Sequence, residues 1–261
     1  MSSGSVIGLA SWVACAMAWS PAPEPRAVSF TTSDDVRITA DFYPSTATGT
    51  ELAPVVILVH MYPADRKSWR PLAPKLQAAG YAVLAYDIRG AGGSVEPAEK
   101  KLKALYDARD SRHFNDAWRD AAAARKWLGD QPNCDASRIA MIGASIGCSI
   151  SLDYGRREPA VKAIICLSPG TNYMGVDSVE HIKKCGDKAM LLMSPKGEYE
   201  AVAALIEASG RKARGQRYDG GREYHGTKMF DAPFSDKVFR DITLFVANFL
   251  PVREKPQEER K

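Results

Sequence analysis

One stretch of the sequence decides the fold: residues 139–154 read IAMIGASIGCSISLDY. The first four of these residues are apolar, which is typical of a short strand buried on both faces. Residues 146–154 have the pattern of a helix, and the motif G-x-S-x-G at 143–147 stands between the two elements. The motif therefore predicts a sharp turn that carries Ser145 from a strand into a helix.

The residue types in this motif have physical reasons. A serine at the tip of such a turn is held in a strained backbone conformation with its hydroxyl exposed. Side chains two residues before and after it would collide with the strand and the helix, which favours Gly143 and Gly147. The positive N-terminal end of the helix favours a negative oxygen at the site. Ser145 is therefore the predicted nucleophile, and the alternative is an ordinary turn between small residues.

Strand and helix patterns alternate along the rest of the chain. This alternation predicts an α/β fold, with a mostly parallel sheet and helices on both faces. The expected strands are 55–59, 82–86, 139–142, 161–167, 189–193 and 214–218, and the expected helices are 72–79, 114–128, 146–154, 199–209 and 235–249. Before them, runs at 28–31 and 36–43 surround Ser33-Asp34-Asp35 and predict an N-terminal antiparallel hairpin. Residues 96–113 are charged and partly helical, and could overhang the site.

Length and charge limit the classes of protein. The 261 residues suffice for one α/β domain, which we expect over residues 28–250, followed by a charged, flexible tail at 251–261. The formal net charge is +4, from 35 Lys and Arg against 31 Asp and Glu. No basic stripe with interleaved aromatic residues is present, so a nucleic-acid partner is not expected. A small-molecule acyl substrate is the expected partner.

The N-terminus has the pattern of an export signal. Residues 1–23 carry no charged side chain, and the apolar run at 6–18 is too short to span a membrane, which needs roughly 20 residues. Residues 16–18 offer a small-x-small cleavage site, and residues 24–27 are expected to be a linker. A periplasmic or extracellular location is therefore predicted. Two alternatives are lipid attachment at Cys15 and a cytoplasmic protein whose N-terminus is not a signal.

The five cysteines do not form a recognisable framework. Cys148 and Cys166 fall within apolar segments, where a free thiol is an ordinary small core residue. Cys134 and Cys185 precede expected strands and would be able to pair in an exported protein. No cysteine or histidine spacing resembles a zinc site, so neither a metal nor another cofactor is expected.

The position of the histidines in the chain selects the base. In sheets that carry this strand–serine–helix turn, the acid and then the histidine follow the nucleophile in the chain. His60 and His113 precede Ser145, and His181 precedes the strand expected at 189–193. His225 follows the last expected strand and precedes the final helix, so it is the predicted base. The alternative is a surface loop histidine.

The acid has three candidates. The turn after the strand at 189–193 is where the acid belongs, and residues 194–200 read SPKGEYE without an aspartate. Glu198 is the preferred candidate because a glutamate can orient an imidazole as an aspartate does. Glu200, in the same turn, and Asp177, after the preceding strand, are the alternatives. Glu198 could also be only a first-turn helix residue that the helix dipole favours.

Two backbone N–H groups are expected to stabilise a negative oxygen. One belongs to Ile146, directly after the nucleophile. The other is expected at the end of the strand 55–59, where Tyr62 is the preferred donor and Met61 the alternative. His60, in the same segment, is expected to brace the loop and not to act in catalysis.

The sequence resembles the α/β-hydrolase superfamily, and within it the small esterases and dienelactone-hydrolase-like enzymes. The resemblance implies an eight-stranded sheet and a covalent acyl-enzyme mechanism. Two departures concern the site, since Met61 replaces the usual glycine after the histidine and Glu198 replaces the usual aspartate. The matching stretches run in order along the chain at 58–60, 68–69, 72–76, 80–84, 86–94, 143–147 and 225–226.

These features predict a serine hydrolase that acts on carboxylic esters or similar acyl compounds. Only residues 168–188 separate two expected strands where lipases often insert a lid, so short acyl chains are expected. Peptidase and thioesterase activities are related possibilities. The competing hypotheses are an inactive hydrolase fold that serves as a binding protein and an acyltransferase on the same fold.

Overall fold

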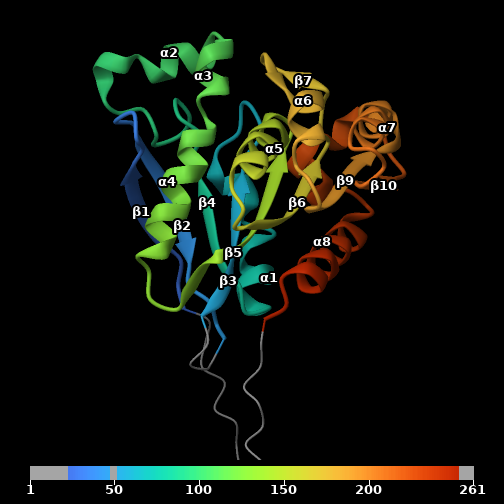
Figure 1. Cartoon of the computed structure of the whole chain (residues 1–261), viewed down its shortest axis with the longest axis horizontal. Helices are drawn as coiled ribbons and strands as arrows, with labels where there is room; N and C mark the ends of the chain where they lie inside the picture. Colours follow the sequence, from blue (N-terminus) through green and yellow to red (C-terminus); the bar gives the residue numbers. More distant parts are fainter. Residues whose placement is uncertain (1–22, 48–51, 253–261) are drawn as a thin grey trace, which may run out of the picture.

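A computed structural model describes residues 23–47 and 52–252 (Figure 1). Its centre is an eight-stranded sheet with the strand order β1-β2-β4-β3-β5-β6-β9-β10. The strands are β1 (Arg26–Thr31), β2 (Arg37–Tyr43), β3 (Ala53–Val59), β4 (Ala82–Tyr86), β5 (Cys134–Ala144), β6 (Val161–Leu167), β9 (Ala189–Pro195) and β10 (Arg214–Tyr218). β2 is antiparallel to both of its neighbours, and the strands from β4 to β10 are parallel. The predicted α/β class, the eight strands and the N-terminal hairpin are confirmed.

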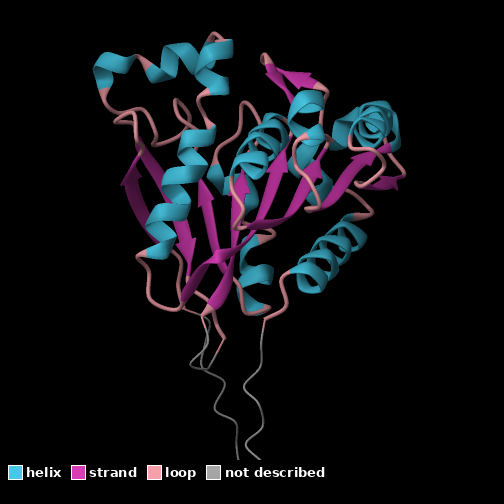
Figure 2. Cartoon of the chain, in the orientation of Figure 1, coloured by secondary structure: helices cyan, strands magenta, loops and turns pink. Residues whose placement is uncertain are grey.

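Helices cover both faces of this sheet (Figure 2). All seven residues of β3 are buried, as expected for an apolar strand at the centre of a parallel sheet. Apolar side chains of α1 (Ala73–Ala78) and α8 (Ser235–Phe249) pack on one face. The other face is covered by α4 (Trp118–Gly129), α5 (Ile146–Arg157), α6 (Ser178–Lys183) and α7 (Tyr199–Ala208).

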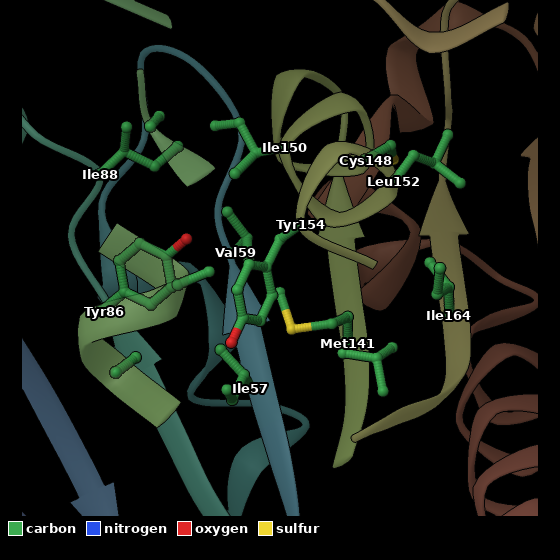
Figure 3. Close-up of a cluster of buried hydrophobic side chains, with 14 of the residues drawn as sticks. Ile57, Val59, Tyr86, Ile88, Met141, Cys148, Ile150, Leu152, Tyr154 and Ile164 are labelled. Carbon is green, nitrogen blue, oxygen red and sulfur yellow. The ribbon is translucent and has the colours of Figure 1, made fainter. Parts of the chain in front are cut away.

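The core beneath α5 holds the serine turn in place. Figure 3 shows Ile57 of β3 and Met141 of β5 beside side chains of α5, including Ile150 and Tyr154. None of these four side chains is more than 3% exposed. Full burial of one such side chain is worth about 1.5–3 kcal/mol. The packing therefore fixes α5, and with it the turn that precedes the helix, against the centre of the sheet.

Two expected segments differ from the structure. The helix expected over residues 114–128 is divided into α3 (Ser111–Asn115) and α4, because hydrogen bonds between residues three apart, such as Ala117 N to Phe114 O at 3.2 Å, interrupt the helical ladder. Residues 168–188, for which no element was predicted, hold a small hairpin, β7 (Asn172–Tyr173) with β8 (Val176–Asp177), and α6. The charged segment 96–113 contains α2 (Leu102–Asp107), which lies with α3 above the carboxyl ends of the central strands (Figure 1).

The possible disulfide between Cys134 and Cys185 is not formed. Both thiols are buried and free. Cys134 begins β5, whereas the Cys185 thiol donates to the carbonyl of His181, at the end of α6. The pairing was wrong because the two cysteines are held by different layers of the fold. Residues 1–22 of the export signal predicted over 1–23, with Cys15, and residues 253–261 of the tail predicted over 251–261 lie outside the described residues. Both stay predictions.

Candidate active site

Ser145 lies on the turn between β5 and α5, at the carboxyl end of a central strand. Its backbone has φ 52° and ψ −119°, a conformation that residues other than glycine rarely adopt. Two backbone hydrogen bonds stabilise this strained conformation. Ser145 N donates to Leu167 O at 2.9 Å, and Ser145 O accepts from Cys148 N at 2.9 Å. The residue is 8% exposed. The fold thus presents one hydroxyl at the first turn of a buried helix.

The flanking glycines allow β5, α5 and β3 to approach closely. A Cβ atom on Gly147 would come within 2.2 Å of the carbonyl oxygen of Val59, and one on Gly143 would come within 2.2 Å of the carbonyl oxygen of Gly147. These neighbours are backbone atoms and cannot rotate away. Glycine is therefore required on both sides of Ser145 for steric reasons.

Replacing Gly147 with alanine is expected to lower the free energy of unfolding by about 3 kcal/mol, because α5 must move away from β3. Urea unfolding followed by circular dichroism measures this change. Gly129→Ala is the matched control, since a Cβ there would lie 3.8 Å from its nearest neighbour, the Cβ of Ala136. The control is expected to be neutral or slightly stabilising. An unchanged unfolding midpoint for Gly147→Ala would show that the contact with β3 is not restrictive.

His225 and Glu198 meet at the same edge of the sheet. His225 lies between two short helical turns that follow β10, and Glu198 ends the turn Lys196–Glu198 after β9. The Nδ1 atom of His225 lies 2.8 Å from Oε1 and 3.0 Å from Oε2 of Glu198. A carboxylate in this position holds the proton on Nδ1, so that Nε2 is free to accept another proton.

The Glu198 carboxylate is stabilised in its ionised form. Burial acts to raise its pKa, but hydrogen bonds from His225 and Ser168 and the nearby charge of Arg222 outweigh this effect and hold the pKa below its usual value. Glu198 therefore stays an acceptor at neutral pH. It can fix the orientation of the imidazole without competing for its proton.

Ser168 connects the histidine loop to the serine turn. It follows β6 directly, is buried and has a left-handed backbone with φ 52°. Its hydroxyl accepts a hydrogen bond from Gly226 N at 2.9 Å. A Cβ atom on Gly226 would lie 3.5 Å from the Cβ of Ala144. The residue after His225 thus packs beside the residue before Ser145, so the backbone of the histidine loop lies next to the serine turn.

The two alternative acids have other surroundings. The Asp177 carboxylate caps α6 by accepting a hydrogen bond from Glu180 N at 3.0 Å. Glu200 is exposed in the first turn of α7. Of the three candidates, Glu198 is the one whose carboxylate lies within hydrogen-bonding distance of the His225 ring.

His60 braces the loop that follows β3. Its ring is fully buried, and Nε2 accepts a hydrogen bond from Ile88 N at 2.9 Å. The ring proton is therefore on Nδ1, which donates to Met61 O at 2.9 Å. Burial lowers the pKa of His60, which keeps the ring neutral. The hydrogen bond from His60 to Met61 O fixes the peptide between Met61 and Tyr62. Because this peptide is planar and trans, the N–H of Tyr62 points in the direction opposite to Met61 O.

The other expected oxyanion donors also lie beside the serine turn. Ile146 is the first residue of α5, where backbone N–H groups have no acceptor within the helix. The Met61 side chain packs against the histidine loop, with its sulfur 2.7 Å from the position of a Cβ on Gly226 and 3.7 Å from the Thr227 hydroxyl. The thioether thus occupies space that a glycine at position 61 would leave open.

Sequence reasoning missed two residues of this site. Ser168 carried one usable signal, since it follows a strand at the edge where the other site residues lie. Tyr173 lies in the β7–β8 hairpin, for which the sequence had no clear pattern, and its ring centre is 6.3 Å from that of His225. Tyr173, Glu198 and Arg222 line a cavity of about 460 Å³.

Within residues 23–47 and 52–252, no group of three or more His, Cys, Asp and Glu side chains is placed to hold a metal ion. No helix in the same ranges combines the length and the apolar character needed to cross a membrane.

The chain belongs to the α/β-hydrolase fold family, whose model matches residues 54–189. The resemblance drawn from the sequence is confirmed. An uncharacterized protein of Mycobacterium tuberculosis is 31% identical over 160 residues, which are 61% of this chain and 50% of that protein. The chain therefore spans about half the length of this relative.

Solved structures share the fold. An esterase of Pyrococcus furiosus aligns with a TM-score of 0.69 and 18% identity, over 87% of this chain and 92% of its own. A dienelactone hydrolase of Anabaena variabilis aligns with a TM-score of 0.68 and 18% identity, over 87% of this chain and 99% of its own. At this level of identity the likeness shows the architecture alone.

Proposed function

We propose that this protein is a serine hydrolase that cleaves a carboxylic ester or a similar acyl compound through an acyl-enzyme intermediate. The observation that carries the proposal is the hydrogen bond of 2.8 Å between His225 Nδ1 and Glu198, in a loop packed against the strained turn of Ser145. A nucleophile beside a base, with the base oriented by a third group, is the arrangement that acyl transfer requires.

The proposed reaction has two halves. In the first, Ser145 Oγ attacks the carbonyl carbon while His225 Nε2 accepts the serine proton, and the same nitrogen then gives that proton to the leaving group. In the second, His225 takes a proton from a water molecule that attacks the acyl carbon. The bond from this carbon to Ser145 Oγ breaks, and His225 returns the proton to Oγ as the acid leaves. Glu198 stays ionised and stabilises the imidazolium in both halves.

Two backbone donors are proposed for the negative oxygen that develops during attack. Ile146 N–H supplies one at the N-terminus of α5, where the helix dipole also favours negative charge. Tyr62 N–H supplies the other, because the His60 brace fixes its peptide, and Met61 N–H is the alternative. Donors held in place before the reaction need no reorganisation when charge develops.

The size of the site favours small acyl compounds. Residues 168–188, between β6 and β9, form one two-stranded hairpin and the short helix α6, not a large apolar lid. The similar folds include proteins named as an esterase and as a dienelactone hydrolase, which agrees with hydrolysis of esters. We therefore propose esters of short-chain carboxylic acids as substrates, and peptide or thioester cleavage as related activities of the same machinery.

A fluorophosphonate probe tests the proposal without knowledge of the substrate. Because the probe reacts only with an activated serine, the protein is expected to be labelled once, at Ser145, and Ser145→Ala is expected to abolish the labelling. Mass spectrometry of the labelled peptide identifies the residue. A folded protein that is not labelled would contradict the proposal and favour a binding protein on a hydrolase fold. For a labelled protein, competition between water and an acceptor alcohol separates hydrolysis from acyl transfer.

A further inference from the structure

Tyr173 occupies a central position in the candidate site. Its ring stands nearly perpendicular to that of His225, with an interplanar angle of 89° and ring centres 6.3 Å apart. Its hydroxyl donates a hydrogen bond to Ser168 O at 3.4 Å. The nearby Ser145 hydroxyl acts to lower the pKa of the phenol. Gly170 makes room for the ring, since a Cβ atom there would come within 2.5 Å of it. The phenol thus lies beside the ring of the proposed base and close to the proposed nucleophile.

This position lies on the path of the leaving group. In the proposed reaction, His225 takes a proton from Ser145 and returns it to the oxygen that departs from the same carbon. The departing oxygen must therefore lie close to the ring of His225 and close to Ser145 Oγ. A hydroxyl on a ring that stands beside His225, close to Ser145, is therefore placed on the side of the site from which that oxygen departs.

Beyond Tyr173 the structure has room for the rest of the leaving group. The cavity of about 460 Å³ that Tyr173 lines is bounded by the polar side chains of Thr171, Glu200 and Arg222. Apolar residues also line it, namely Pro169 and, on α7, Ala201 and Ala204. A cavity with these donors and acceptors fits a polar, hydroxylated group better than an alkyl chain, because polar groups that lose water without new hydrogen bonds are costly.

We propose that Tyr173 donates a hydrogen bond to the leaving oxygen of the substrate, and that the adjoining cavity binds a polar, hydroxylated leaving alcohol. This inference rests on the proposed function and specifies its substrate class: short-chain esters of polyols. Tyr173 would then act directly on the substrate, beside the general acid His225.

The protonation state of Tyr173 agrees with a role as donor. Burial, with a smaller contribution from the charge of Glu198, raises the pKa of the phenol to about 12. The hydroxyl therefore keeps its proton through the neutral and moderately alkaline range.

Two acetate esters with different leaving groups test the inference. Tyr173→Phe keeps the ring and removes the hydroxyl. It is expected to lower kcat/KM for glyceryl monoacetate about tenfold, the effect of one hydrogen bond, because the glyceryl alkoxide leaves poorly without assistance. For p-nitrophenyl acetate the expected change is less than about twofold, since p-nitrophenolate is a good leaving group without a hydrogen bond. The wild-type protein is also expected to prefer glyceryl monoacetate to butyl acetate.

Tyr154→Phe is the matched control. It removes a phenol hydroxyl from α5 that is 3.4 Å from Glu158, and is expected to leave both rates unchanged. An equal loss on both esters, no loss on either, or a wild-type preference for butyl acetate would overturn the inference while leaving the proposed function intact. Failure of the proposed function is recognised separately, because the wild-type protein would then neither hydrolyse an ester nor react with the fluorophosphonate.

Discussion

His225→Ala is expected to lower kcat for ester hydrolysis by about 10⁴- to 10⁶-fold, since no other group then accepts the Ser145 proton. Adding Ser145→Ala to this variant is expected to lower the rate little further. The residues of a nucleophile–base unit act together, so removal of either one removes most of what both supply. The residual rate should reflect only the backbone donors and substrate binding. Steady-state kinetics with a short-chain ester measures kcat for the two variants and the wild type.

His181→Asn is the matched control for this prediction. His181 lies in α6, and its Nε2 atom is 3.6 Å from the Asp153 carboxylate in the second half of α5, away from the serine turn. It is expected to keep nearly normal kinetics, and thermal unfolding of each variant shows whether a loss of rate reflects a loss of fold. If His225→Ala retained more than about one hundredth of the wild-type rate, a histidine base would be excluded.

Glu198→Gln is expected to lower kcat by about 10²- to 10⁴-fold, with little change in stability. A glutamine amide can donate to Nδ1 of His225, which stabilises the ring form that carries its proton on Nε2. That form cannot accept the serine proton. Replacement of the carboxylate also removes the negative charge that stabilises the imidazolium. Initial rates of ester hydrolysis at neutral pH measure this change in kcat.

Asp177→Asn is the matched carboxylate-to-amide control. Asparagine caps a helix as well as aspartate does, so α6 is expected to remain folded and the activity to remain near that of the wild type. The opposite result, a loss with Asp177→Asn and none with Glu198→Gln, would assign the acid to Asp177.

The acid side of the pH profile follows from the same contacts. The pKa of Glu198 lies below its ordinary value of 4.5, so this carboxylate loses its charge only at a pH below that value. Loss of charge on Glu198 is therefore not expected to lower kcat/KM between neutral pH and pH 4.5, and the pH dependence of ester hydrolysis measures this.

Local sequence patterns determined the main elements of the fold. The strands at 82–86, 161–167 and 214–218 and the helix at 235–249 have the bounds that the residue patterns predicted, because periodicity and burial act over a few neighbouring residues. The G-x-S-x-G motif placed Ser145 on the turn that the structure describes. Chain order alone nominated His225, since it was the histidine after the last strand.

Tertiary structure decided which side chains complete the site. Glu198 lies 27 residues from His225, and Gly226 lies 58 residues from Ser168, so no local pattern relates either pair. The hairpin that carries Tyr173 has strands of two residues, too short to show a period, and it forms because it packs against α5 and α6. Motif and chain order specified a nucleophile and a base. The acid, the Ser168 hydroxyl that holds the histidine loop and the phenol beside the histidine depend on contacts between segments far apart in the chain. These contacts exist only once the sheet and its helices have assembled.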